Sequence, residues 1–352
     1  MEILPYLKLL RDKQGSDLFF TVDSKPRIKI EGLLSEVGEK KIDSEIIEGF
    51  AEELMTEEQK TAFHNSFDID FAFQLPDESA RFRVNIFKQR GSFAMVLRLV
   101  PVKIPDLDDL KVPSVLQDLM VEKRGLMLMV GATGSGKSTT LAALLNHRNS
   151  NKAGHILTIE DPIEFSHPNL KSIVNQRELG VDTVSYKAAL KASLREAPDV
   201  IMVGEIRDRD TMEAVLELCN TGHLAISTLH ANNANQAIER IINLFPQDLH
   251  KQLLMDLSLN LKAIVSQRLI RSKSGKRIAA VEVMVNGPHI SDLILKGALG
   301  DLKEAMEAGG QKGMQTFDTA LLELYKSNLI TVDEALQNAD SRTNLEAKIN
   351  FG

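Results

Sequence analysis

A glycine-rich stretch near the middle of the chain carries the clearest chemical signal in the sequence. Residues 131–138 complete the pattern G-x-x-x-x-G-K-[ST]. The apolar run Leu126–Val130 before the stretch suits a buried strand, and the Ala/Leu-rich run after it favours a helix. In this setting, loop N–H groups and the helix N-terminus converge on phosphate oxygens. The sequence therefore predicts a nucleotide site formed by Gly131, Ala132, Thr133, Gly134, Ser135, Gly136, Lys137, Ser138 and Thr139.

Acidic residues end two further apolar runs, at Glu160 and at Glu205. Ligands gather at the carboxyl ends of strands in open parallel sheets, so both acids are expected to face the same phosphates as Lys137. One acid would orient or deprotonate the attacking water, and the other would hold Mg²⁺ directly or through water. We predict ATP and Mg²⁺ as ligands, with Ser138 and Glu205 on the metal. The alternative is that the two acids are exposed strand ends.

Two histidines, His223 and His230, stand at either end of the apolar run 224–229. Their spacing fits neither H-x-x-x-H nor a Cys/His zinc pattern. A histidine near the γ-phosphate can donate a hydrogen bond, while the plainer alternative is a capping or core histidine. The residues alone leave both interpretations open.

The segment 81–86 alternates cleanly between polar and apolar residues, as a half-buried strand does. Phe82 and Val84 share one face, and Arg81 and Arg83 share the other. The two arginines could be a solvated surface, or cations supplied across a subunit interface to a neighbour's nucleotide.

Composition narrows the class of protein. The chain has 352 residues, enough for two domains, and a net charge of −7, which argues against a general nucleic-acid binder. No apolar run approaches the roughly 20 residues that span a bilayer. The N-terminus lacks the features of a secretory signal. The single cysteine, Cys219, is expected to be a core residue, and we expect a cytoplasmic protein.

The elements that must position these residues fall into distinct stretches. Residues 1–100 mix short helices, the first near Glu2–Lys13, with alternating strands, and prolines punctuate 101–113. From residue 114, short apolar strands alternate with helices, which is typical of a parallel sheet covered by helices. Beyond Gln247 a mostly helical chain is predicted, because leucines recur at helical spacing through Leu261 and Ile264. The basic segment 271–277 is expected to be a solvated hairpin, with an anionic-lipid or partner contact as the alternative.

The order of the motifs resembles that of the secretion and type IV pilus ATPase family. The phosphate loop is followed by Ile159-Glu-Asp-Pro-Ile-Glu164, Gly204-Glu-Ile-Arg-Asp208, and Thr221-Gly-His223 with Thr228-Leu-His230. The resemblance implies an α/β chain: a PAS-like α+β domain (1–100), a linker (101–113), a RecA-like P-loop NTPase core (114–290) and a mainly helical C-terminal region (291–352). It also implies a hexameric motor whose nucleotide lies between the two domains. Residues that would then belong to the site are Arg81, Arg83, Arg98, Arg195, Arg207, His223 and His230.

Within that family, the chain is most similar to the pilus retraction ATPases, the PilT/PilU group. Extension and type II secretion members carry a longer N-terminal part and a four-cysteine insertion, whereas this chain has one cysteine and begins at the PAS-like domain. The segment His289–Lys296 has Ser291 and Leu295 where PilT-type members carry arginines, which resembles the PilU branch. This implies an accessory motor with intact hydrolysis.

The same resemblance implies the partners and the location of the protein. The expected partners are further copies in a ring, a PilT-type ATPase and the inner-membrane pilus platform protein, without nucleic acid. The expected location is cytoplasmic, at the inner face of the cytoplasmic membrane at the pilus base. A type IV secretion ATPase, a RecA-like DNA translocase and a non-catalytic partner subunit are the alternatives.

Overall fold

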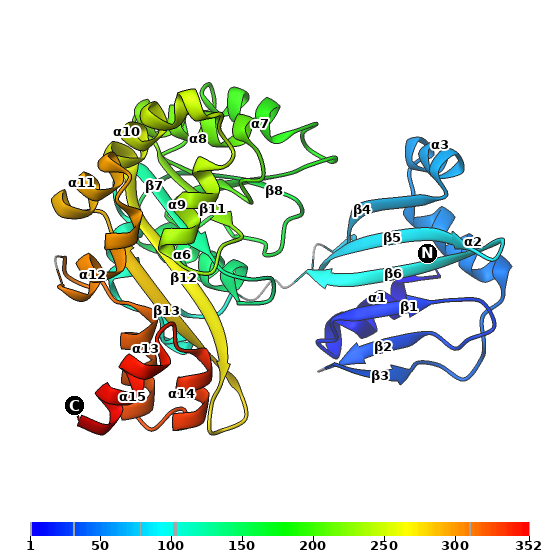
Figure 1. The fold of residues 1–352 in the computed structure, drawn as a ribbon. Coiled ribbons are helices and arrows are strands. Elements are labelled where there is room, and N and C mark those ends of the chain that lie inside the picture. Colours follow the sequence, from blue (N-terminus) through cyan, green and yellow to red (C-terminus); the bar gives the residue numbers. More distant parts are fainter. Residues whose placement is uncertain (1, 31, 78, 101–103, 310, 352) are drawn as a thin grey trace. The chain divides into compact units, whose positions relative to one another are not determined.

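The computed structural model describes residues 2–30, 32–77, 79–100, 104–309 and 311–351. The chain divides into two compact units, residues 1–103 with 164–166 (unit 1) and residues 104–163 with 167–352 (unit 2) (Figure 1). The first three residues of the predicted linker, 101–103, lie outside the described residues. Its remainder contains a short helix, α4 (Leu107–Leu110).

Unit 1 is built on a six-stranded antiparallel sheet in the order β3-β2-β1-β6-β5-β4. The strands are β1 (Asp17–Phe20), β2 (Arg27–Ile30), β3 (Leu33–Glu36), β4 (Asp68–Gln74), β5 (Arg81–Gln89) and β6 (Ser92–Val100), and the helices are α1 (Leu4–Asp12), α2 (Ser44–Leu54) and α3 (Glu57–Ser66). The alternation predicted for 81–86 is confirmed, since Phe82 and Val84 are fully buried and Arg81 and Arg83 are half-buried. The predicted N-terminal helix is α1, which buries Leu7 and Leu10.

Unit 2 contains a seven-stranded sheet in the order β13-β12-β7-β11-β10-β8-β9. All neighbouring strands are parallel except β12 and β13. The four predicted strands are confirmed as β7 (Gly125–Val130), β8 (Gly154–Glu160), β10 (Val200–Val203) and β11 (Leu224–Leu229). The sequence did not predict β9 (Ser172–Glu178). The hairpin predicted at 271–277 is confirmed as the turn between β12 (Leu261–Arg271) and β13 (Arg277–Val285), although the length of these two strands was not predicted.

The prediction of a mostly helical chain beyond Gln247 is wrong for residues 261–285. Helix α10 (His250–Asn260) ends before Leu261, and Leu261 and Ile264 belong to β12. β12 pairs with β7 on one side and with β13 on the other. The helical spacing of leucines in α10 happens to continue into the first residues of β12, so the pattern does not reveal where the helix ends. The long hairpin forms because its apolar residues complete the buried sheet.

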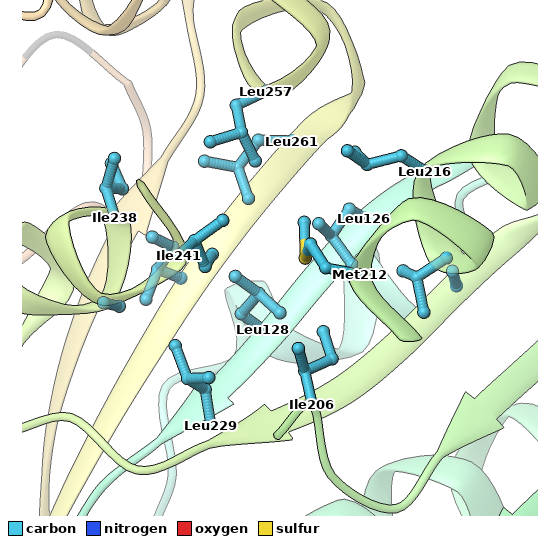
Figure 2. Packing of buried hydrophobic residues seen from close by; sticks show 14 of the residues in the cluster. Leu126, Leu128, Ile206, Met212, Leu216, Leu229, Ile238, Ile241, Leu257 and Leu261 are labelled. Carbon is cyan, nitrogen blue, oxygen red and sulfur yellow. The ribbon is translucent and has the colours of Figure 1, made fainter. Parts of the chain in front are cut away.

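Both faces of the unit 2 sheet are covered, which explains why every residue of β7 is buried. Leu126 and Leu128 of β7 pack against α8 (Arg209–Asn220) and α9 (Ala234–Ile242), as Figure 2 shows. Met127 and Met129 pack on the other face with α5 (Val115–Met120) and α6 (Lys137–Asn151). Helix α7 (Tyr186–Ser193) also covers the sheet on the side of α8.

Shorter helices follow the hairpin, and some pack on its far end. Phe317 and Leu321 join Ile270 and Ala280 of the hairpin in a separate small core. The elements are α11 (Pro288–Lys296), α12 (Leu302–Glu307), α13 (Phe317–Lys326), α14 (Val332–Asn338), α15 (Arg342–Phe351) and two 3-10 turns at Gln247–Leu249 and Leu299–Asp301. No helix among the described residues has both the length and the apolar character needed to cross a bilayer.

The cysteine prediction concerns α8. Cys219 is buried there, and burial raises the pKa of its thiol to about 12. Such a thiol is a core residue rather than a nucleophile.

Candidate active site

The glycine-rich loop connects β7 to α6 at the carboxyl edge of the unit 2 sheet. Gly131, Gly134 and Gly136 have positive φ angles of 152°, 77° and 85°, which favour glycine. A Cβ on Gly131 would lie 2.5 Å from Ser135 Oγ, so the loop has no room for a side chain there. Helix α6 begins directly after the loop at Lys137, so its first N–H groups face the loop.

The loop fits a phosphate group. Lys137 folds back across the loop, and its Nζ donates to the carbonyls of Gly131 at 2.7 Å and Ala132 at 2.9 Å. Ser135 Oγ is buried and has no hydrogen-bond partner among the residues that the structure describes. A tight loop, a helix N-terminus and an ammonium group at one place match the chemistry of a bound phosphate.

Glu160, at the end of β8, is buried and firmly held. Its Oε1 accepts hydrogen bonds from Thr158 Oγ1 at 2.6 Å and from Gln176 Nε2 at 3.1 Å. Because two neighbouring side chains hold the carboxylate, its orientation is set by β8 and β9.

Glu205 lies two residues after β10 and joins a chain of charges. Its Oε2 accepts from Arg207 Nε at 2.9 Å, and its Oε1 lies 3.3 Å from His230 Nε2. Arg207 also lies 3.6 Å from Asp161, which follows Glu160. The hydrogen bond to Glu205 raises the pKa of the Arg207 guanidinium. The carboxyl ends of β8, β10 and β11 thus contribute one linked cluster.

Tyr186, the first residue of α7, lies against this cluster. A Cβ on Gly204 would lie 2.9 Å from the Tyr186 hydroxyl, so a side chain there would displace the tyrosine. Burial, and next the charge of Asp161, raise the pKa of the phenol. The hydroxyl therefore stays neutral beside the acids.

The oxygens of Ser138 and Glu205 are the hard donors that Mg²⁺ prefers. Among the described residues, no group of three or more His, Cys, Asp or Glu side chains could hold a metal ion. Mg²⁺ commonly takes one or two protein ligands beside substrate phosphates and water, so this donor set fits it.

A cavity of about 300 Å³ lies beside the loop, between the first turn of α6 and the β12–β13 hairpin. Its lining includes Gly136 and Thr139 together with the apolar side chains of Leu110, Leu269 and Ile278. Apolar walls next to a phosphate-binding loop suit a nucleoside.

Two predicted site residues lie at the opposite, amino edge of the sheet. The carbonyl of His223 accepts from the N–H of Gly125, the first residue of β7, and its Nδ1 lies 3.1 Å from the carbonyl of Leu218. Arg195 is exposed between α7 and β10. The predicted phosphate contacts of His223 and Arg195 therefore have no support within one subunit.

The three remaining arginines belong to unit 1. Arg83 on β5 and Arg98 on β6 are direct cross-strand partners, so their side chains share one face of that sheet with Arg81. Arg98 Nε donates to Asp17 Oδ1 at 2.7 Å, which offsets part of the repulsion between neighbouring arginines.

The sequence profile of the family described as "Type II/IV secretion system protein" matches residues 11–318. The chain belongs to this family.

Three relatives show where in the family the similarity is greatest. The chain is 48% identical over 353 residues to the type IV pilus ATPase PilU of Pseudomonas aeruginosa, covering 100% of this chain and 92% of that protein. It is 38% identical over 339 residues to the type IV pilus retraction ATPase PilT of the same organism, covering 96% and 98%. A crystal structure of the pilus retraction motor PilT with bound ADP is 38% identical and superimposes with a TM-score of 0.91, covering 98% of both chains.

Helix α11 carries Ser291 and Leu295, the two positions at which the sequence predicts a difference from PilT-type members. Ser291 Oγ donates to the carbonyl of Ser258 at 2.8 Å, and Leu295 is 50% exposed. Lys296 Nζ lies 2.6 Å from Asp292 Oδ2, so its ammonium group forms an ion pair within the same helix.

Sequence reasoning missed three residues at the site of this family member: Tyr186, Gln176 and Gln267. Tyr186 and Gln176 carry no motif signal, because only the fold brings α7 and β9 beside the acids. Gln267 had a detectable signal, since Ser266-Gln267 interrupts an apolar run and buried polar groups need partners.

Proposed function

We propose that this protein is a cytoplasmic ATPase motor that couples ATP hydrolysis to type IV pilus retraction. The observation that carries the proposal is the phosphate-binding loop beside the linked cluster Asp161–Arg207–Glu205–His230, in a chain similar over its whole length to PilU. A loop that grips phosphates and fixed acids next to it provide the two parts that phosphoryl transfer to water requires.

In the proposed mechanism, the N–H groups of the loop and of α6 bind the β- and γ-phosphates of ATP, and Lys137 turns from the loop carbonyls to the phosphate oxygens. Glu160, held by Thr158 and Gln176, orients the attacking water and accepts its proton. Ser138 and Glu205 would hold Mg²⁺, which when bound neutralises charge on the phosphate oxygens. His230 and Arg207 hold Glu205 and face the leaving phosphate.

The proposed assembly is a hexameric ring of subunits with a PAS-like N-terminal domain (1–100), a RecA-like core (114–290) and a helical C-terminal region (291–352). Its support is the row of Arg81, Arg83 and Arg98 on one sheet face, where a phosphate would relieve the repulsion between like charges. In the ring, these arginines complete a nucleotide site together with the loop.

Mixing two inactive variants tests this assembly. Arg81→Ala subunits mixed with Lys137→Ala subunits should regain part of the lost turnover, because some interfaces then pair two intact halves. Absence of rescue at every mixing ratio, with ring formation verified by mass, would show that the arginines do not act across an interface.

We further propose an accessory role at the inner face of the cytoplasmic membrane, alongside a PilT-type ATPase and the pilus platform protein. The support is α11, where Ser291 and Leu295 replace the two arginines of the PilT-type pattern. Labelled pili should retract rarely in cells that carry this protein as their only retraction ATPase. Normal retraction frequency and speed there would refute the accessory role, and absence of ATP turnover in the purified ring would refute the motor itself.

A further inference from the structure

Gln267 is a buried polar side chain in the middle of β12, and its side-chain hydrogen bonds go to the nucleotide loop and to the first turn of α6. It is 2% exposed. β12 pairs with β7 as far as Ser266 and Val130, so Gln267 is the next residue, alongside the point where the loop leaves the sheet.

The two ends of its amide contact both sides of the junction between loop and helix. Gln267 Nε2 donates to the carbonyl of Ser135 at 2.9 Å, and Gln267 Oε1 accepts from Thr140 Oγ1 at 2.9 Å. Thr140 in turn donates its backbone N–H to the carbonyl of Gly136, which closes the first turn of α6. One side chain therefore connects the last part of the loop to the start of the helix.

The bond to Ser135 fixes the direction of a phosphate-binding group. In a planar trans peptide, the C=O and the following N–H point in opposite directions. Because the Ser135 carbonyl faces Gln267, the N–H of Gly136 faces away from β12, toward the side on which phosphate binds. The loop packs closely against Gln267. A Cβ on Gly136 would lie 2.8 Å from Gln267 Nε2, and a Cβ on Gly131 would lie 2.6 Å from the Gln267 carbonyl oxygen.

We propose that Gln267 is a positioning residue for ATP hydrolysis, which holds the 135–136 peptide and the first turn of α6 in the phosphate-binding conformation. The proposal rests on the ATPase function proposed above. It requires a neutral amide: a carboxylate in its place would have no donor for the Ser135 carbonyl and would add negative charge beside the phosphates.

The neighbouring residues of β12 have separate partners, so a change at Gln267 leaves the strand anchored. Ser266 Oγ donates to Glu282 at 2.9 Å. Arg268 donates to Asp340 at 2.7 Å and stacks 3.8 Å above the Phe317 ring.

The test compares Gln267→Met, which keeps the length and removes both hydrogen bonds, with Gln315→Met as the matched control. Gln315 is half-buried, and its Nε2 donates at 2.7 Å to the carbonyl of Val281 on β13, the cross-strand partner of Gln267 and one strand further from the loop. We expect Gln267→Met to weaken ADP binding about tenfold and to lower kcat about 10- to 100-fold, because a displaced loop loses phosphate contacts and alignment. Gln315→Met should leave both within about twofold.

Variants of the partner residue separate positioning from general loss of stability. Thr140→Val should weaken ADP binding while Thr140→Ser restores it, and Gln267→Met combined with Thr140→Val should cost less than the sum of the two. Gln267→Glu should be the most damaging single change. Wild-type ADP affinity and kcat in Gln267→Met would overturn the proposal, as would equal effects of Gln267→Met and Gln315→Met.

The two proposals can fail separately. If the wild-type ring binds ADP without turning over ATP, the motor function is refuted and the ADP affinities still decide the role of Gln267. If Lys137→Ala abolishes turnover while Gln267→Met does not change it, only the positioning role is refuted.

Discussion

The two edges of the unit 2 sheet carry similar residue types in very different surroundings. At the carboxyl edge, His230 lies 3.3 Å from the Glu205 carboxylate, next to Arg207. At the amino edge, the ring of His223 lies by the Thr221 hydroxyl and the last turn of α8. Both histidines flank β11, yet only His230 joins the charged cluster.

The two histidines differ in surroundings because the whole length of β11 lies between them. Six residues of β11 at about 3.3 Å each place them roughly 20 Å apart. A parallel sheet collects functional groups at one edge because only the loops after its strands converge there. Residues at the amino edge, such as His223, therefore lie about one strand length from the nucleotide loop.

The largest expected effect concerns the residues that face the phosphates, with the far end of α6 as the control. Lys137→Ala and Glu205→Ala should each lower ATP turnover by about 10³-fold or more, because each group faces phosphate charge or its metal. Lys152, at the other end of α6, donates to the carbonyl of Val121, so Lys152→Ala should stay within about twofold. Steady-state phosphate release with folding checked by circular dichroism measures this contrast, and a wild-type rate in Lys137→Ala would contradict the site.

The histidine pair tests the comparison directly. His230→Ala should lower turnover about 10- to 100-fold, because Glu205 loses a partner beside the phosphates. His223→Ala should change it by less than about threefold, since its ring only caps local structure. The reverse order of effects in single-turnover assays would mean that the amino edge completes a neighbour's site, as the family resemblance implied for His223 and Arg195.

A buried acid at the carboxyl edge should affect stability rather than catalysis. Glu282 on β13 accepts from the N–H of Ala234, the first residue of α9, and burial raises the pKa of its carboxyl to about 7 from an ordinary 4.5. A raised pKa in the folded state adds stability that is fully present below pH 4.5 and is lost as the pH rises through 7.

Glu282→Gln keeps an acceptor oxygen and removes this titration. The free energy of unfolding of the wild type should therefore fall relative to Glu282→Gln by roughly 1–3 kcal/mol between pH 5 and pH 8. Urea unfolding at both pH values measures the difference. Ser266→Ala is the control, because it removes one hydrogen bond to Glu282 but keeps the titrating carboxylate. A constant difference across this range would contradict the assigned burial of charge.

The smallest expected effect lies at the amino edge on α11. Leu295 is half-exposed, and Ser291 binds the end of α10, far from the loop. Leu295→Arg should therefore leave ATP turnover within about twofold, whatever it does to pilus retraction. A change of tenfold or more in turnover would show that the two edges are coupled.

Local sequence patterns determined much of this protein. Glycines, a lysine and flanking apolar runs specify the strand, loop and helix around residues 131–138, because backbone geometry and helix propensity act over a few residues. The same holds for the alternation in β5 and for the four apolar strands. Each depends on neighbours within about one turn or one strand.

The tertiary structure alone decided the rest. Residues 261–271 became strand β12 because β7 pairs with them on one side and residues 277–285 pair with them on the other, which leucine spacing could not reveal. The tertiary structure also placed Gln267 against the nucleotide loop, although Gln267 and Ser135 are 132 positions apart in the sequence. The order and direction of the strands decide which strand ends lie together at one edge of the sheet. Strand order and direction in turn depend on burial and pairing between segments that are distant in the sequence. For that reason His223 and His230, so alike in sequence, lie at opposite edges of one sheet.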